Sequence, residues 1–289
     1  MLNWSIRLFR IFRIQLSVHS TFFLLLAYVA WEGWRDAPAD HLSQPIYGSL
    51  INVAALVVFF ACVVLHELGH ALTARRFGVG VPRILLLPIG GMAEFDSIPR
   101  KPSSELLIAL AGPAVNFAIV AVLLLFVRVP GAEIVSLVQS VFSSASSDGE
   151  TSMSIVQQCL AVLITMNLIM GCFNLVPVFP MDGGRVLRAL LASRLNYLQA
   201  TFYAATTAKV LATVAIVVAL YHGKLQISVL FAFIFFAGEM EYRAVKRRER
   251  DDERWRQRLE ALEAAAIMPS ATLGRTEPGE CSLDGPPAG

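Results

Sequence analysis

The amino-acid sequence predicts an α-helical polytopic membrane protein, with six transmembrane helices and a short re-entrant β-hairpin between the second and third helices. Its 289 residues are 56% hydrophobic, and their mean hydropathy is +0.61. Only 16% of the residues are charged, whereas a soluble domain carries about a quarter. Six apolar segments approach the ~20 residues that a helix needs to cross the hydrocarbon, and the loops between them differ in their content of lysine and arginine.

Residues 1–19 are expected to form an interfacial segment that leads into the first helix. Within it, "RIQLSV" at residues 13–18 alternates between polar and apolar side chains, which predicts a short strand. The alternative is a signal peptide, because arginines precede an apolar stretch. This alternative is disfavoured, since the best cleavage site, in "DAPAD" at residues 36–40, lies beyond a tryptophan-rich rim.

The membrane domain is expected to cover residues 20–243. Its apolar segments lie at about 20–36, 48–73, 105–127, 154–176, 203–221 and 225–242. The last two are joined by little more than "HGK", which predicts a tight helical hairpin. The Gly112-Pro113 pair inside the third segment would be unusual in a soluble helix, but a membrane bundle tolerates it.

The basic residues of the loops predict that both termini are cytoplasmic in a multi-pass protein of the cell membrane. The outer loops contain only Arg35, Arg128 and Lys224. The inner segments contain Arg7, Arg10, Arg13, Arg75, Arg76, Arg83, Arg100, Lys101, Arg185, Arg188 and Arg194.

One partly apolar stretch, residues 79–99, is too short and too interrupted to cross the membrane. Its segment "RILLLPIGGMAEF" predicts two short strands around Gly90 and Gly91. We expect this hairpin to dip into the inner face of the membrane.

The C-terminal part is predicted to differ from the membrane domain. Residues 244–267 have many opposite charges four residues apart, with Trp255, Leu259 and Leu262 on one side, and they predict a helix that lies on the membrane or self-associates. Residues 268–289 are rich in Pro, Gly and Ser, which predicts disorder.

Composition also excludes some classes of function. The net charge is only +2, and no basic stripe with interleaved aromatic residues is present, so no nucleic-acid partner is expected. None of the four cysteines lies in a CxxC pair, which argues against a disulfide framework or a cysteine zinc site.

The motif "HELGH" stands within the second apolar segment, where ionisable groups are costly and need a partner or a function. His66 and His70 are four residues apart and therefore project from one face of a helix. That spacing allows two imidazole nitrogens to reach one Zn²⁺, with Glu67 beside them as a general base. The alternative is a pair of histidines that are simply hydrogen-bonded in a helix bundle.

A catalytic zinc site usually has three protein ligands, so a third is expected at a similar depth. His66 lies nine residues before Arg75, or about 13 Å at helical rise, on the cytoplasmic side of the hydrocarbon. Asp182 is the acidic residue that can reach this level, because Pro177 and Pro180 end the fourth helix. Its alternative role is an ordinary helix N-cap ahead of "GGRVLRALL".

These residues carry a family resemblance. "HELGH", "GPAVN" in the third helix and "NLVPVFPMDGGRVLRAL" after the fourth resemble the signature set of the site-2 protease family of intramembrane zinc metalloproteases. "LPIGGMAEF" and "ELLIALAGP" are similar to its compact prokaryotic branch, which lacks PDZ and CBS domains. The resemblance covers roughly residues 10–243.

The resemblance implies a chain that hydrolyses peptide bonds in or near the transmembrane segment of single-span membrane-protein substrates. It implies one Zn²⁺ per chain, held by His66, His70 and Asp182, with Glu67 as the catalytic base. It also implies that Asn116 and Asn174 hold the scissile carbonyl or the geometry of the site, and that Gly90 and Gly91 belong to a hairpin whose free edge binds substrate. For the asparagines the alternative is a packing hydrogen bond, and for the glycines it is a plain turn.

Two rival functions remain open from the sequence. A metal-ion or proton transporter would use the same histidines and carboxylates as a relay, but it requires polar residues across the membrane, and the second helix is apolar from Val53 to Leu65. An inactive binding protein is the other rival, and the intact Glu67 argues against it. The bilayer is an expected partner, whereas an oligomer is possible but not predicted.

Overall fold

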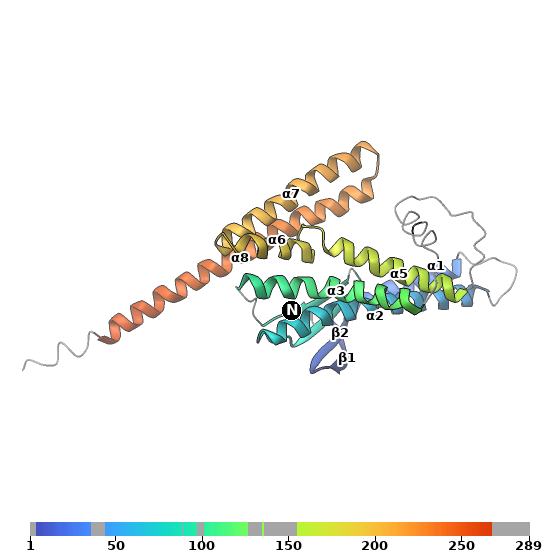
Figure 1. The fold of residues 1–289 in the computed structure, drawn as a ribbon, viewed down its shortest axis with the longest axis horizontal. Helices are drawn as coiled ribbons and strands as arrows, with labels where there is room; N and C mark the ends of the chain where they lie inside the picture. Colours follow the sequence, from blue (N-terminus) through green and yellow to red (C-terminus); the bar gives the residue numbers. More distant parts are fainter. Residues whose placement is uncertain are drawn as a thin grey trace, which may run out of the picture. The chain divides into compact units, whose positions relative to one another are not determined.

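The computed structural model describes residues 4–35, 44–88, 90–96, 101–126, 135 and 155–267 (Figure 1). The helices are α1 (Thr21–Arg35), α2 (Gln44–Arg76), α3 (Pro102–Phe126), α5 (Ile155–Asn174), α6 (Asp182–Ala192), α7 (Tyr197–Tyr221) and α8 (Leu225–Ile267). The strands are β1 (Ser5–Ile11), β2 (Ile14–His19), β3 (Arg83–Leu87) and β4 (Gly90–Glu94). The chain divides into two compact units, Met1–Tyr242 and Arg243–Gly289.

Each of the six predicted apolar segments contains a helix. Four helices are long and apolar enough to cross a membrane, and they contain Ile46–Arg76, Pro102–Leu125, Tyr197–Tyr221 and Leu225–Ala264. Helix α1 has 15 residues, and the apolar helix Cys159–Asn174 is also short of that length. In the most apolar stretch of each spanning helix, only 17% to 33% is buried inside the protein. Their apolar side chains therefore face outward, as lipid-facing side chains do.

The strands form one sheet in the order β1-β2-β3-β4. β1 pairs antiparallel with β2, and β3 with β4, whereas β2 and β3 are parallel, with Leu16 opposite Ile84. The hairpin predicted near residues 83–95 is thus present. The sequence did not predict β1 or the joining of both hairpins through a parallel pair, because such pairing depends on the path of α1 and α2 between the strands.

The glycine pair of the hairpin is not where the sequence placed it. Leu87 pairs with Gly90, and Leu86 with Gly91, so both glycines are strand residues of β4 and the turn precedes them. Gly90 has φ +140°, a conformation that a side chain disfavours. The expectation that the two strands lie on either side of Gly90-Gly91 was therefore wrong, because both glycines pair with residues of β3.

A core beneath the sheet joins it to the helices. Ile14, Leu16 and Val18 of β2 pack in one buried cluster with Phe60 and Val63 of α2. β4 lies at one edge of the sheet, and the fold brings it against α2 at Gly91. The helix that carries the HELGH motif is therefore fixed to the sheet along its second half.

The segment between α5 and α6 packs closely against two glycines in the first turn of α6. A Cβ on Gly183 would collide with the carbonyl oxygens of Leu175 and Val176, and a Cβ on Gly184 would lie 2.8 Å from the backbone of Val178 and Phe179. The helix therefore starts tightly against the chain that precedes it. This close approach sets the position of Asp182.

Helices α7 and α8 pack closely through small residues. Ala208 and Ala212 of α7 are buried with Ile234 of α8, as small residues allow between membrane helices. An ion pair of 2.7 Å joins Lys209 to Glu239 across the same contact.

Gly183→Ala is expected to destabilise the protein, because the added methyl group meets two carbonyl oxygens that have no room to move. Overpacking of this kind costs about 1–3 kcal/mol. The measurement is thermal unfolding of purified protein in detergent. Gly238→Ala is the matched control, since its Cβ would lie 3.5 Å from Ala208 Cβ, an ordinary contact. Equal melting temperatures for the two variants would refute the prediction.

Candidate metal centre

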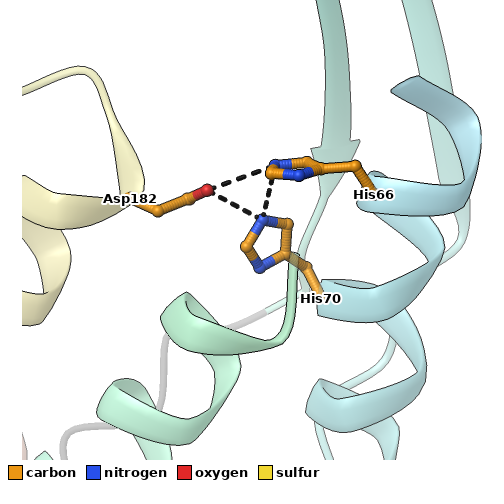
Figure 2. Close-up of side chains that lie close together, drawn as sticks. All are labelled: His66, His70 and Asp182. Atoms are coloured by element: carbon orange, nitrogen blue, oxygen red, sulfur yellow. Dashed lines mark hydrogen bonds and ion pairs between the residues drawn. The ribbon is translucent and has the colours of Figure 1, made fainter. Parts of the chain in front are cut away.

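Three ionisable side chains from two distant helices meet inside the protein (Figure 2). His66 and His70 come from α2, and their Nε2 atoms lie 3.1 Å apart. Asp182, the first residue of α6, places Oδ2 3.2 Å from His66 Nε2 and 3.0 Å from His70 Nε2. The three residues are between 3% and 8% exposed. The HELGH motif and Asp182 are thus brought together across 112 residues of sequence.

The outer nitrogen of each histidine is held by α3. His66 Nδ1 lies 3.2 Å from Asn116 Oδ1, and His70 Nδ1 lies 2.6 Å from the carbonyl oxygen of Ile108. Both partners are oxygen acceptors, so each Nδ1 carries the proton and donates it. Each Nε2 then keeps its lone pair, which points to the common centre, and this is the arrangement that metal-binding histidines adopt.

Asp182 does not serve as a helix N-cap. The N-cap of α6 is Met181, which makes no side-chain capping bond. The carboxylate of Asp182 instead contacts both imidazoles. The N-cap alternative that the sequence left open is therefore excluded by the geometry.

The three side chains form a group suited to one metal ion. Their nearest nitrogen and oxygen atoms lie within 4.8 Å of one another. Two imidazoles and one carboxylate are a common protein ligand set for zinc, with the fourth tetrahedral position open. A cation at this point would be held by three atoms that can each supply a lone pair in a buried site.

Gly112 of α3 is a site residue that the sequence analysis did not identify. A Cβ at this position would collide with Nε2 and Cε1 of His70 and would lie 2.7 Å from His66 Cε1. Nearby, a Cβ on Gly69 would lie 2.7 Å from the carbonyl oxygen of Ala111. The two glycines let α2 and α3 approach closely. A glycine within an apolar helix, facing the HELGH segment, was the available signal.

Glu67 lies beside this centre but outside the cluster. It is half-buried, and its side chain packs against β4, because a Cβ on Gly91 would lie 2.6 Å from Glu67 Cγ and 3.2 Å from Oε1. Gly91 therefore leaves the space that the glutamate occupies. The structure places this edge strand against the predicted catalytic base.

The four residues predicted to bind substrate lie in different places. Asn116 is fully buried against His66, and Gly91 contacts Glu67. Asn174 ends α5, half-buried, and its side chain forms no hydrogen bond within the described residues. A Cβ on Gly90 would have no atom within 4 Å. Only Asn116 and Gly91 thus touch the cluster and its neighbouring glutamate.

A buried ion-pair network holds the helix that carries Asp182. Arg188 of α6 is 1% exposed, and its guanidinium lies 2.5 Å from Glu105 Oε1 of α3 and 2.7 Å from Glu241 Oε1 of α8. It also lies over the rings of Phe179 and Tyr197. Burial acts to lower the pKa of Arg188, but Glu105, Tyr197 and Glu241 together outweigh burial, so the pKa of Arg188 is raised. Arg188 is therefore charged, and it ties α6 to two other helices.

From the sequence, Arg188 was expected only to be a basic residue of an inner segment. Position alone does not distinguish a solvated arginine from a buried one. Its place on the same helix as Asp182, six residues further along, was the only signal.

Comparison with known proteins defines the class to which this fold and site belong. The family model Peptidase family M50 matches residues 54–220, which is more than half of the chain. The solved structure of the site-2 protease from Methanocaldococcus jannaschii aligns with a TM-score of 0.53 and 36% identity, covering 83% of this chain and 95% of that one. The chain belongs to Peptidase family M50.

Two curated relatives add to this. Zinc metalloprotease MJ0392 of Methanocaldococcus jannaschii is 37% identical over 246 residues, which are 85% of this chain and 62% of the relative. Putative zinc metalloprotease Rip3 of Mycobacterium tuberculosis is 31% identical over 191 residues, 66% of this chain and 44% of the relative. The chain thus spans less than two thirds of these relatives.

Asn116→Ala is expected to weaken zinc binding by about 10–100-fold, because His66 loses the acceptor that fixes its ring and tautomer. The affinity is measured by competition with a chelator on purified protein. Asn167→Ala is the matched control, since Asn167 is equally buried but donates to Leu163 of α5 and to Cys62 Sγ of α2, not to either histidine. Equal zinc affinity in the two variants would exclude the role of Asn116.

Arg188→Met is expected to lower the free energy of unfolding by about 3–5 kcal/mol, because it leaves the buried Glu105 carboxylate without its cation. Chemical unfolding followed by helical circular dichroism measures the loss. The double variant Arg188→Met/Glu105→Gln should recover a large part of it. A double variant as unstable as the sum of its two single variants would show that the two residues do not interact.

Proposed function

We propose that this chain is an intramembrane zinc metalloprotease, which hydrolyses peptide bonds in or near the transmembrane segment of membrane proteins. The observation that carries the proposal is the His66–His70–Asp182 cluster with Glu67 on the next position of the same membrane-spanning helix. Membership of Peptidase family M50 and the names of the zinc metalloprotease relatives support it.

The residues divide the chemistry between them. His66, His70 and Asp182 would hold the zinc ion, which supplies a Lewis acid for water and the peptide carbonyl. Glu67 accepts a proton from the attacking water and delivers it to the departing amine, so Glu67 is a carboxylate again at the end of the reaction. Asn116 and Ile108 keep both imidazoles oriented throughout.

Substrate binding is proposed to involve the edge strand β4 and the end of α5. The outer edge of β4 has no partner strand among the described residues, and an extended peptide can add to such an edge. Gly91 and Gly90 would bring the peptide backbone beside Glu67, and Asn174 would contact it from α5. A transmembrane substrate must unwind first, because a helix hides its amides in its own hydrogen bonds.

The finer topology is part of this proposal. Helices α1 and α5 would complete six transmembrane helices in a domain of residues 20–243, with the β3–β4 hairpin re-entering the inner face of the cell membrane. Both termini, with the interfacial segment 1–19, the charged helix 244–267 and the tail 268–289, would be cytoplasmic, as the basic residues predict. Single-span proteins are the proposed substrates.

The transporter alternative is not favoured. The relatives carry protease names, and the described polar cluster is confined to one level of α2, since residues 53–65 preceding it are apolar. A relay across the membrane would need polar groups beyond that level.

Glu67→Gln is expected to keep zinc and to lower the cleavage rate by about 10²–10⁴-fold, since the amide cannot accept the proton. Wild type and variant are co-expressed with a panel of tagged single-span membrane proteins, which are examined for a shorter fragment. His70→Ala serves as the companion variant and should lose both metal and cleavage. A fragment that persists with Glu67→Gln would refute the assignment of the base.

A further inference from the structure

The N-terminal hairpin presents apolar side chains that nothing in the described structure covers. In and around β1 the exposed fractions are Trp4 75%, Ile6 52%, Leu8 49%, Phe9 54% and Phe12 63%. The paired strand β2 is almost entirely buried against the core. Of the two strands, β2 supplies the side chains that pack into the core. The exposed apolar side chains of β1 form a surface of the kind that marks an interaction site.

The turn of the hairpin has an unusual sequence for its conformation. β1 ends at Ile11 and β2 starts at Ile14, so Phe12 and Arg13 form a two-residue turn with φ of 49° and 65°. Glycine and asparagine are the residues that such turns favour. A bulky phenylalanine held there, 63% exposed, indicates that its side chain is required at the tip rather than merely accommodated.

The hairpin is also exclusively cationic. Arg7, Arg10 and Arg13 recur every third residue, with two apolar residues between them, and the first carboxylate of the chain is Glu32. Of the three, Arg10 contacts the neutral Gln15 at 3.1 Å. The mixture of aromatic and cationic groups without acidic ones matches a surface that is apolar inside and negatively charged outside.

The position of the tip identifies that surface. Arg75, in the last turn of α2, donates a hydrogen bond to the carbonyl oxygen of Phe12. Arg75 is also the penultimate residue of the spanning segment Ile46–Arg76, so the tip lies at the level where this span ends. At the other end of the hairpin, β2 leads into α1 after a single residue, Ser20.

We propose that the β1–β2 hairpin docks onto the bilayer. Phe12 and the apolar side chains of β1 enter the interface, and Arg7, Arg10 and Arg13 bind the phosphates of anionic lipids. Because β2 pairs with β3, and β4 holds Gly91 against Glu67, docking fixes the level of the whole sheet relative to the membrane. The proposal does not depend on proteolysis.

The test places a single fluorescent residue at the tip. Phe12→Trp is combined with Trp4→Phe, Trp31→Phe, Trp34→Phe and Trp255→Phe, all at exposed positions. The full chain is reconstituted in nanodiscs of phosphatidylcholine alone or with phosphatidylglycerol. Quenching by acrylamide reports exposure to water, and quenching by lipids brominated near the headgroup reports insertion.

With phosphatidylglycerol present, the tip is expected to be quenched by brominated lipid and protected from acrylamide. In the same background, Arg7→Gln/Arg10→Gln/Arg13→Gln should shift the docking equilibrium toward water by roughly fivefold for each arginine. The matched Arg→Lys triple variant should retain docking, because it keeps the charge. Circular dichroism of each variant establishes that the helices are intact.

Two results would overturn the proposal. One is a tip that acrylamide quenches equally in both lipids without quenching by brominated lipid. The other is protection that depends on protein concentration and not on lipid, which would assign the hairpin to contact with a second copy of the chain.

Discussion

The centre depends on how closely the backbones of α2 and α3 approach. Two imidazoles from one helix face can share a centre only if the facing helix lacks a side chain there, and Gly112 meets that condition. One turn on either side of it, Ile108 and Asn116 accept the Nδ1 protons of His70 and His66. Three positions at intervals of four on α3 thus provide the space and both hydrogen-bond acceptors.

Asp182, the third side chain of the centre, belongs to α6, which is positioned by backbone contacts and a buried ion pair. Tight backbone contacts at Gly183 and Gly184 set where α6 begins, and Arg188, near the middle of α6, is held between Glu105 and Glu241. Glu105 lies one turn before Ile108 on α3. The same helix therefore orients the histidines and, through an ion pair, the helix that carries Asp182. Removing one partner of such a buried pair is costly, whereas replacing the whole pair with well-packed apolar residues is often neutral for stability.

Periodicity and residue spacing predict local structure and motifs, so those parts of the fold and site could be predicted from the sequence. The helical segments, the strand near residues 13–18, the hairpin and the pairing of HELGH with Asp182 were all predictable, because each is local or carried by a motif. The parallel β2–β3 pair, the burial of Arg188 and the role of Gly112 were not. Each depends on which distant backbone lies opposite, and the sequence of one element does not contain that information.

The separation of the cluster in sequence has a consequence for biosynthesis. His66 and His70 emerge from the ribosome long before Asp182, which is 112 residues beyond His70. Until α6 is made and packed against α3, the two histidines lack the Asp182 carboxylate. Loop closure over such a length comes late in assembly. A nascent chain therefore has an incomplete centre while its first helices are inserted, and the complete cluster can form only after residue 182 of 289 has been made.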